Sequence, residues 1–201
     1  MTNQAQQSAT AKFGAHETME VHEVLTGIID GINNFELYRD HVRDQQLGTI
    51  LDHQLQFMTE EYNTLLQAVQ QNGMSEAAPY RWPKNVSPKY GLRHPAPVSP
   101  NASPNEMDDR DVASAMLGQH KSGAIKKITA ALECANPQLR SIIQQSAINC
   151  TEQAFEVWNF MNQRGMYQVP TMMDMTTNTL VNAYSSANAT GQGQGAPAWP
   201  Q

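Results

Sequence analysis

The stretch MSEAAPYRWPKNVSPKYGLRHPAPVSPNASPNEM, residues 74–107, separates the two halves of this 201-residue chain. It holds seven of the chain's eleven prolines, which indicates a connection without regular secondary structure. A structureless loop of 34 residues is uncommon inside a compact domain. The fold must therefore be one in which a single long connection is a normal part of the architecture.

Helical periodicity fills the sequence on both sides of this connection, with apolar residues recurring every three or four positions. The expected helices cover about 16–42, 44–72, 108–134 and 137–164. In the third of them the apolar stripe comprises Ala113, Leu117, Ala124, Ile128 and Ala131. The first two helices are joined by a short turn, and so are the last two, which predicts two antiparallel hairpins.

The lengths of these segments fit one architecture. A helix of 27 residues is about 40 Å long, and 34 extended residues reach further than that. One long crossover between two hairpins is found in ferritin-like folds. We therefore predict an all-α, ferritin-like four-helix bundle over residues 16–170, with the proline-rich crossover 74–107 running lengthwise. Residues 1–15 are expected to form a flexible N-terminal segment, and residues 171–201 a flexible or partner-ordered tail.

Composition narrows the classes of function. Charged residues make up 16% of the chain and the formal net charge is −6, which gives no electrostatic reason to expect nucleic acid as a partner. No apolar run approaches the roughly eighteen residues of a membrane helix, so we expect no membrane insertion. The N-terminus has no apolar segment of the kind found in secretory signals, which predicts synthesis in a cytosol.

The two cysteines, Cys134 and Cys150, fall in helices joined by a tight turn. Cys150 lies thirteen residues beyond Pro137, which places it roughly 20 Å along its helix. A disulfide needs Cα atoms within about 7 Å. We therefore expect both thiols to be unbridged within one chain.

The stretch HETMEVHEVL, residues 16–25, raises the question of a metal site. Ferritin-like di-metal centres take a glutamate from two helices and a Glu-x-x-His motif from each of the other two. No glutamate of this chain has a histidine three residues further on. The two His-Glu pairs also point to different sides of a helix. We expect no metal, no cofactor and no catalytic residue.

Several polar residues nevertheless fall on or beside the apolar faces of the expected helices. Buried polar groups must be paired, because each unpaired one costs about 1–3 kcal/mol. The sequence therefore predicts an internal network of hydrogen bonds and ion pairs, with Glu17 paired to His120 as the leading hypothesis. An unusual single-metal site and partial exposure to solvent remain as alternatives. The predicted polar core consists of Glu17, Gln54, Glu61, His120, Lys121 and Gln153.

Two stretches of the sequence carry distinctive motifs, the first from Gly14 to Asn63 and the second from Asp109 to Pro170. The more specific pieces are His16-Glu17, His22-Glu23, His120-Lys121, LECANP at 132–137, NC at 149–150 and YQVP at 167–170. In these residues the chain resembles the spore coat protein F (Coat F) family of endospore-forming bacteria.

The resemblance implies a ferritin-like structural protein of the bacterial spore coat, made in the mother-cell cytosol and without established catalytic residues. Its expected partners are other spore coat proteins and further copies of itself. The competing interpretation is a metal-binding or oxidoreductase protein on the same scaffold, because a fold does not fix a function.

Overall fold

The structure is a computed structural model that describes residues 13–71 and 76–187. Most of the expected N-terminal segment and the end of the expected tail lie outside the described residues. The described part contains helices and no named strand, so the prediction of an all-α protein is confirmed. The helices are α1 (Ala15–Arg39), α2 (Gln45–Gln71), the short 3-10 helix η1 (Pro104–Glu106), α3 (Asp109–Glu133), α4 (Pro137–Gln163) and α5 (Asp174–Val181).

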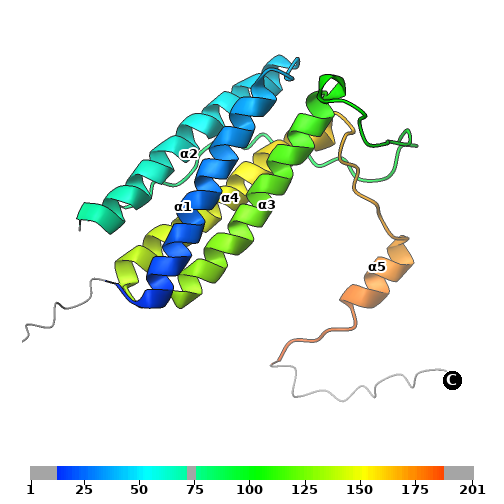
Figure 1. Cartoon of the computed structure of the whole chain (residues 1–201). Helices are drawn as coiled ribbons and strands as arrows, with labels where there is room; N and C mark the ends of the chain where they lie inside the picture. The colour runs from blue at the N-terminus through cyan, green and yellow to red at the C-terminus, as the bar shows by residue number, and fades with distance from the viewer. Residues whose placement is uncertain (1–12, 72–75, 188–201) are drawn as a thin grey trace, which may run out of the picture.

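The four long helices lie side by side and form one body (Figure 1). α3 and α4 share the most extensive contact, and α1 packs on both α2 and α3 while α2 packs on α4. Neighbouring helices in this ring run in opposite directions, since short turns join α1 to α2 and α3 to α4. None of the described helices combines the length and the apolar character that a membrane span requires.

Side-chain caps set the starts of α3 and α4 where the sequence changes from turn to helix. Asp108 accepts hydrogen bonds from the backbone N–H groups of Arg110 and Asp111 at the start of α3. Asn136 does the same for the first turn of α4, whose opening residue is Pro137. Such caps supply partners for N–H groups that a helix cannot satisfy itself, and each contributes about 1 kcal/mol.

Two hydrophobic clusters form the core, one toward each end of the body. The first cluster includes Phe35, Leu47, Leu51, Met116, Val157 and Phe160. The second includes Val21, Val24, Ile28, Leu65, Ala130 and Ile143. Along α2, α3 and α4 the sequence positions between the two clusters are occupied by buried polar residues. The core is therefore interrupted halfway along the body by a polar layer.

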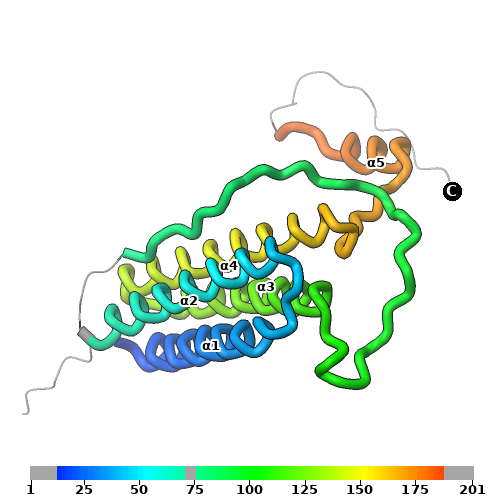
Figure 2. Tube along the Cα trace, turned by 90° about the horizontal axis from the view of Figure 1, so that it is seen from above, coloured from blue at the N-terminus to red at the C-terminus, as the bar shows by residue number. Residues whose placement is uncertain are grey.

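The connecting segment, residues 76–107, runs back beside α4 from the end of α2 toward the start of α3 (Figure 2). Two asparagines of α4 hold it there. Asn149 accepts from the backbone N–H of Tyr80, and Asn162 accepts from the backbone N–H of Lys89 and donates to its carbonyl oxygen. Beyond this point Gly91 donates its N–H to the carbonyl oxygen of Val169.

The tail contains a helix that the sequence analysis did not anticipate. α5 is only eight residues long, and none of its residues is buried. Figures 1 and 2 show α5 standing off the four-helix body at the end of the chain that leaves α4.

The asparagine anchors generate a first prediction. Asn162→Ala removes the hydrogen bonds to both backbone groups of Lys89, which lowers the free energy of local opening by about 1–3 kcal/mol. Limited trypsinolysis should then cut after Lys89 between about fivefold and a hundredfold faster than in the wild type. Asn33→Ala, an exposed asparagine of α1, is the control and should leave the rate unchanged. Equal rates for all three proteins would show that Asn162 does not hold the segment.

Candidate functional site

The centre of the polar layer is an ion pair between α2 and α3. The Lys127 ammonium lies 2.8 Å from Oε2 of Glu61, and both side chains are less than a tenth exposed, at 7% and 4%. The other Glu61 oxygen accepts a hydrogen bond from the Asn149 amide at 2.9 Å. A charge removed from water must be paired, so the two helices are held in one register by this contact.

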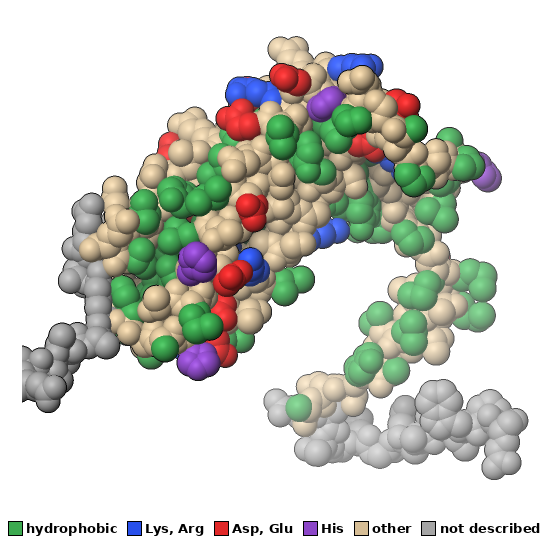
Figure 3. Space-filling model, viewed as in Figure 1, with side chains coloured by type: hydrophobic (Ala, Val, Ile, Leu, Met, Phe, Trp, Pro, Cys, Tyr) green, Lys and Arg blue, Asp and Glu red, His purple; other side chains and the backbone are tan. Residues whose placement is uncertain are grey.

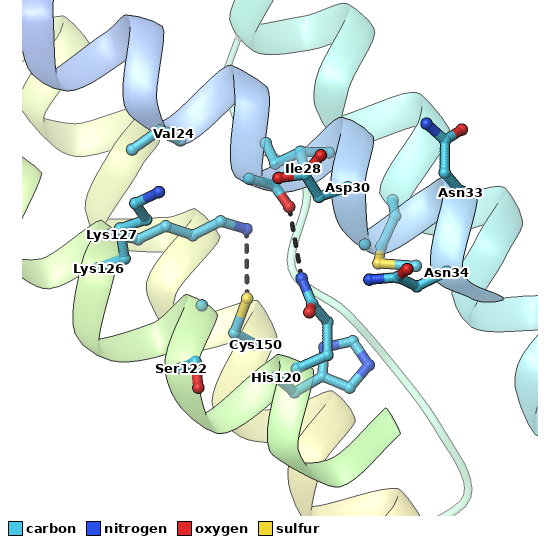
Figure 4. Close-up of a pocket in the computed structure, with 15 residues that line it drawn as sticks. Val24, Ile28, Asp30, Asn33, Asn34, His120, Ser122, Lys126, Lys127 and Cys150 are labelled. Atoms are coloured by element: carbon cyan, nitrogen blue, oxygen red, sulfur yellow. Dashed lines mark hydrogen bonds between the residues drawn. The ribbon is translucent and has the colours of Figure 1, made fainter. Parts of the chain in front are cut away.

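Lys127 also donates to the sulfur of Cys150, at 3.2 Å (Figure 4). Burial raises the pKa of the Cys150 thiol above its usual value, which keeps it neutral. Burial is the largest single influence on the pKa of Lys127 and would lower it, but the charge of Glu61 together with the contacts to Glu61 and Cys150 outweighs burial, and the Lys127 pKa is raised. The site therefore contains a charged lysine, a carboxylate and an un-ionised thiol, the unreactive form of cysteine.

A second chain of hydrogen bonds passes from His120 to the connecting segment. His120 Nε2 lies 2.8 Å from Oε1 of Gln54, and the Gln54 amide donates to Oε2 of Glu156 at 2.9 Å. The Tyr80 hydroxyl donates to the same Glu156 oxygen and also lies 2.9 Å from Nδ1 of His53. The polar layer thus joins α2, α3, α4 and the connecting segment.

Burial fixes the protonation states in this chain. His120 is 2% exposed, its ring meets the Phe35 ring edge to face, and burial with the nearby charge of Lys127 lowers its pKa to about 3. A neutral imidazole with Nε2–H donating to the Gln54 oxygen satisfies this geometry. Burial, together with the hydrogen bond to Glu156, raises the pKa of Tyr80 above its usual value, so the phenol stays protonated.

Glu17 is buried, as its position on the apolar face suggested, but its predicted pairing with His120 is wrong. Its carboxylate accepts from the backbone N–H groups of Gly14 and Asn136, at 2.6 and 2.5 Å. These hydrogen bonds, that from Asn136 first, lower the pKa of Glu17. The physical reason is height along the body: His120 lies thirteen residues before the end of α3, roughly 20 Å from the turn that Glu17 contacts.

Lys121, predicted to belong to the polar core, is a second correction. Its side chain is exposed and its ammonium lies over the Tyr167 ring, 5.2 Å from the centroid. Lys127 occupies the buried position instead. The apolar stripe of α3 misled the prediction, because Ile128 is 46% exposed whereas Ala130 and Ala131 are buried.

A spacing in the sequence could have identified Lys127. Gln54 and Glu61 are seven residues apart on α2, and His120 and Lys127 are seven residues apart on α3. Seven residues are two helical turns, so each pair lies on one face. Two facing helices with polar residues at the same spacing can form two layers of contact, as Gln54–His120 and Glu61–Lys127 do.

Gln153, the last member of the predicted polar core, is fully buried at the same level. Its carbonyl oxygen accepts from the Gln54 amide at 3.2 Å. Within the described chain its side-chain amide makes no hydrogen bond. Gln153 therefore takes part through its backbone, whereas Gln54, Glu61 and His120 take part through their side chains.

Beside the ion pair lies a hollow of about 410 Å³ between α1 and α3, walled by Gly27 and Gly31 on one side and Gly123 on the other. His120, Lys127 and Cys150 form part of its floor. Across residues 13–71 and 76–187, no group of three or more His, Cys, Asp or Glu side chains is placed to hold a metal ion. The groups at this position offer an ammonium and a thiol rather than a set of anionic ligands.

Comparison with known proteins assigns the chain to a family. A profile described as the Coat F domain matches residues 108–170, which cover α3, α4 and the start of the tail. Over 206 residues the chain is 32% identical to the spore coat protein F-like protein YhcQ of Bacillus subtilis (strain 168), covering 97% of this chain and 93% of that protein. The chain therefore belongs to the Coat F family, as the resemblance indicated.

A solved structure shares the fold. It is the crystal structure of a candidate spore coat protein of Bacillus halodurans C-125, which superimposes with a TM-score of 0.59 over 81% of this chain and 96% of the other. The two sequences are 14% identical, so the likeness concerns the arrangement of the helices.

The buried ion pair generates a second prediction. Lys127→Met leaves the Glu61 carboxylate buried without its cation, and Glu61→Gln leaves the ammonium without its anion. Each change should lower the free energy of unfolding by roughly 3–5 kcal/mol, and the double variant should lose less than the sum. Lys126→Met is the control, because Lys126 forms an exposed pair with Glu23 that contributes at most about 1 kcal/mol. Urea unfolding measures all four variants, and strictly additive losses would contradict the pairing.

The buried histidine generates a third prediction. The pKa of His120 is 6.5 in the unfolded chain and about 3 in the folded chain. As pH falls below 6.5, the unfolded chain therefore binds a proton on His120 that the folded chain does not bind until about pH 3. The free energy of unfolding should therefore fall with decreasing pH, by up to roughly 1.4 kcal/mol for each pH unit between 6 and 5.

His120→Gln keeps a donor for Gln54 and should remove this slope, while His22→Gln, at an exposed histidine of α1, should retain it. Protonation of Glu17 also weakens the fold, but only at lower pH, because the Glu17 pKa lies below its usual value. An unchanged slope in His120→Gln would show that His120 is not the group that titrates.

Proposed function

We propose that this protein is a structural component of the bacterial endospore coat, which acts by associating with itself or with other coat proteins and has no catalytic activity. Its location in the coat is supported by membership of the Coat F family and by the name of the B. subtilis relative, which matches nearly the whole chain. We further propose that the fold is a ferritin-like four-helix bundle with a proline-rich crossover, and that the protein is made in the mother-cell cytosol.

The observation that carries the structural role is that the polar side chains of the layer form ion pairs and hydrogen bonds with one another. Lys127 is paired with Glu61, His120 with Gln54, and Tyr80 with Glu156. General acid–base catalysis needs a group whose pKa lies near the working pH. Burial lowers the pKa of His120 to about 3, far below that range. The layer supports packing and register better than proton transfer.

The donor set also favours structure over metal chemistry. A di-metal site needs several carboxylates facing one another, and it gains from anionic charge. Here the Lys127 ammonium stands against Glu61 and supplies the positive charge that the carboxylate needs. A metal cation placed at this position would be repelled by the ammonium at short range. Around Glu61 and Lys127 the polar layer is therefore best explained as a part of the packed core whose charges are already paired.

The coat assignment can be tested in sporulating Bacillus. An epitope-tagged chain, produced under mother-cell control, should appear in the detergent-extracted coat fraction of purified spores. The matched control is an unrelated cytosolic four-helix protein with the same tag and promoter, which should remain in the mother-cell lysate. Recovery of both proteins in the lysate alone would overturn the proposed location.

Metal analysis tests the non-catalytic part separately. Purified chain incubated with Fe²⁺, Mn²⁺ or Zn²⁺ and then desalted should hold far less than one ion per chain by elemental analysis. One bound ion per chain in the wild type that is lost in Glu61→Gln would favour a metal-binding protein instead.

A further inference from the structure

A second hollow, of about 770 Å³, lies between the start of α2, the second half of α4 and the connecting segment. Its wall includes Ile50 of α2, Glu156 and Asn159 of α4, and Trp82 of the connecting segment. The volume is within the range of about 300–1,000 Å³ that is usual for small-molecule sites. This hollow shares no lining residue with the one between α1 and α3.

Glu156 is a buried carboxylate, 8% exposed, whose hydrogen bonds use one oxygen only. Its Oε2 accepts from the Gln54 amide and from the Tyr80 hydroxyl. Within residues 13–71 and 76–187, Oε1 receives no hydrogen bond and Glu156 forms no ion pair. Glu61, by contrast, has Lys127 as its cation. Because a buried carboxylate is costly without a cation, Glu156 lacks in the described chain the kind of partner that Glu61 has.

Asn159 lies three residues beyond Glu156 on α4, so the two side chains project from one face of the helix. The Asn159 Oδ1 atom is buried, and no described residue donates a hydrogen bond to it. A buried acceptor without a donor destabilises the fold. Both residues line the hollow, which therefore brings together two acceptors that lack a donor.

The other charged groups of this wall neutralise one another. Arg164 lies 2.8 Å from Asp44 in an ion pair, and both residues line the hollow. The charge of Glu156 therefore leaves the wall with a net negative charge. Trp82 donates its indole N–H to Glu152 at 3.2 Å, which holds the ring in the wall. A tryptophan ring attracts cations more strongly than other aromatic side chains do.

The basic side chains of the described chain are engaged at other places. Lys84 of the connecting segment pairs with Glu152 at 2.7 Å, and Lys89 donates to the carbonyl oxygen of Gln163. On the face of the molecule seen in Figure 3, several basic side chains lie next to acidic ones, as in the pair of Lys126 and Glu23. A cation for Glu156 would therefore come from outside the described chain.

The unpaired groups suit an ammonium better than a metal ion. In the part of the chain that the structure describes, no three His, Cys, Asp or Glu side chains are grouped to hold a metal. A primary ammonium has three N–H donors and needs acceptors rather than several anions. Lys127 shows this chemistry inside the protein, since its ammonium donates to one carboxylate oxygen of Glu61 and to the Cys150 sulfur.

We propose that the second hollow binds the primary ammonium group of an alkylamine, carried either by a small free amine or by a lysine side chain of another protein. We name its four wall residues Ile50, Trp82, Glu156 and Asn159 the amine pocket. Glu156 Oε1 and Asn159 Oδ1 accept the N–H groups, and Glu156 balances the charge. Ile50 and Trp82 offer apolar surface to the alkyl stem. Amine binding is independent of the coat location, so either proposal can fail without the other.

Calorimetric titration of the full chain with n-butylammonium, the analogue of a lysine side chain, tests the pocket. A dissociation constant of about 1 mM or lower is expected. n-Butanol has the same shape without the charge, and tetramethylammonium has the charge without N–H donors. Both should bind at least about tenfold more weakly at equal ionic strength. No heat from n-butylammonium, or equal binding of either control ligand, would overturn the proposal.

Variants of the two acceptors locate the binding. Glu156→Gln keeps a carbonyl oxygen for Gln54 and Tyr80, and it should raise the dissociation constant at least about tenfold. Its melting midpoint without amine should be unchanged or higher, because a buried charge without a cation has been removed. Asn159→Leu, similar in size but without an acceptor, should also weaken binding. Glu23→Gln removes the same charge from an exposed position of α1 and is the matched control.

Wild-type affinity in both Glu156→Gln and Asn159→Leu would show that the amine binds elsewhere, and an equal loss in Glu23→Gln would show attraction by net charge alone. A lysine carrying an acetyl group and a methylamide in place of its neighbours then separates the two sources. An affinity equal to that of n-butylammonium assigns the pocket to a lysine of another protein. A dissociation constant at least about tenfold higher assigns it to a free amine.

Discussion

The ion pair between Lys127 and Glu61 is the contact on which the middle of the structure depends. Two opposite charges are withdrawn from water at a point where both hydrophobic clusters end. Their desolvation is costly, and only close contact with additional hydrogen bonds compensates it. Asn149 supplies one of those bonds to Glu61. The pair therefore requires α2, α3 and α4 to meet at a single relative height.

The same requirement explains why the connecting segment is ordered although it is rich in proline. Asn149 donates to Glu61 and to the carbonyl of Ala78 while accepting from the backbone of Tyr80. Tyr80 in turn places its hydroxyl on Glu156. The segment thus completes the hydrogen bonding of the polar layer and is held by it. Proline helps here because it limits the freedom of the unfolded segment.

The polar layer has a physical use in packing. Apolar contacts tolerate sliding of one helix along another, whereas a buried charge or amide has a partner at one register only. The Lys127–Glu61 and His120–Gln54 contacts lie two turns apart and cannot both form if either helix shifts. These contacts therefore fix the relative height of α2 and α3.

The sequence by itself determined the number of long helices, their approximate limits and the burial of Glu17, Gln54, Glu61, His120 and Gln153. Periodicity and proline content carry that information, because the angular position of a residue on a helix follows from its number. The tertiary structure alone decided which residues meet. Glu17 pairs with the backbone of Asn136 because height along the body depends on how the hairpins dock. It also decided which of the two apolar faces of α3 turns inward. Either face of that helix could supply hydrophobic burial, and the contact of Lys127 with Glu61 distinguishes them only after α2 is in place.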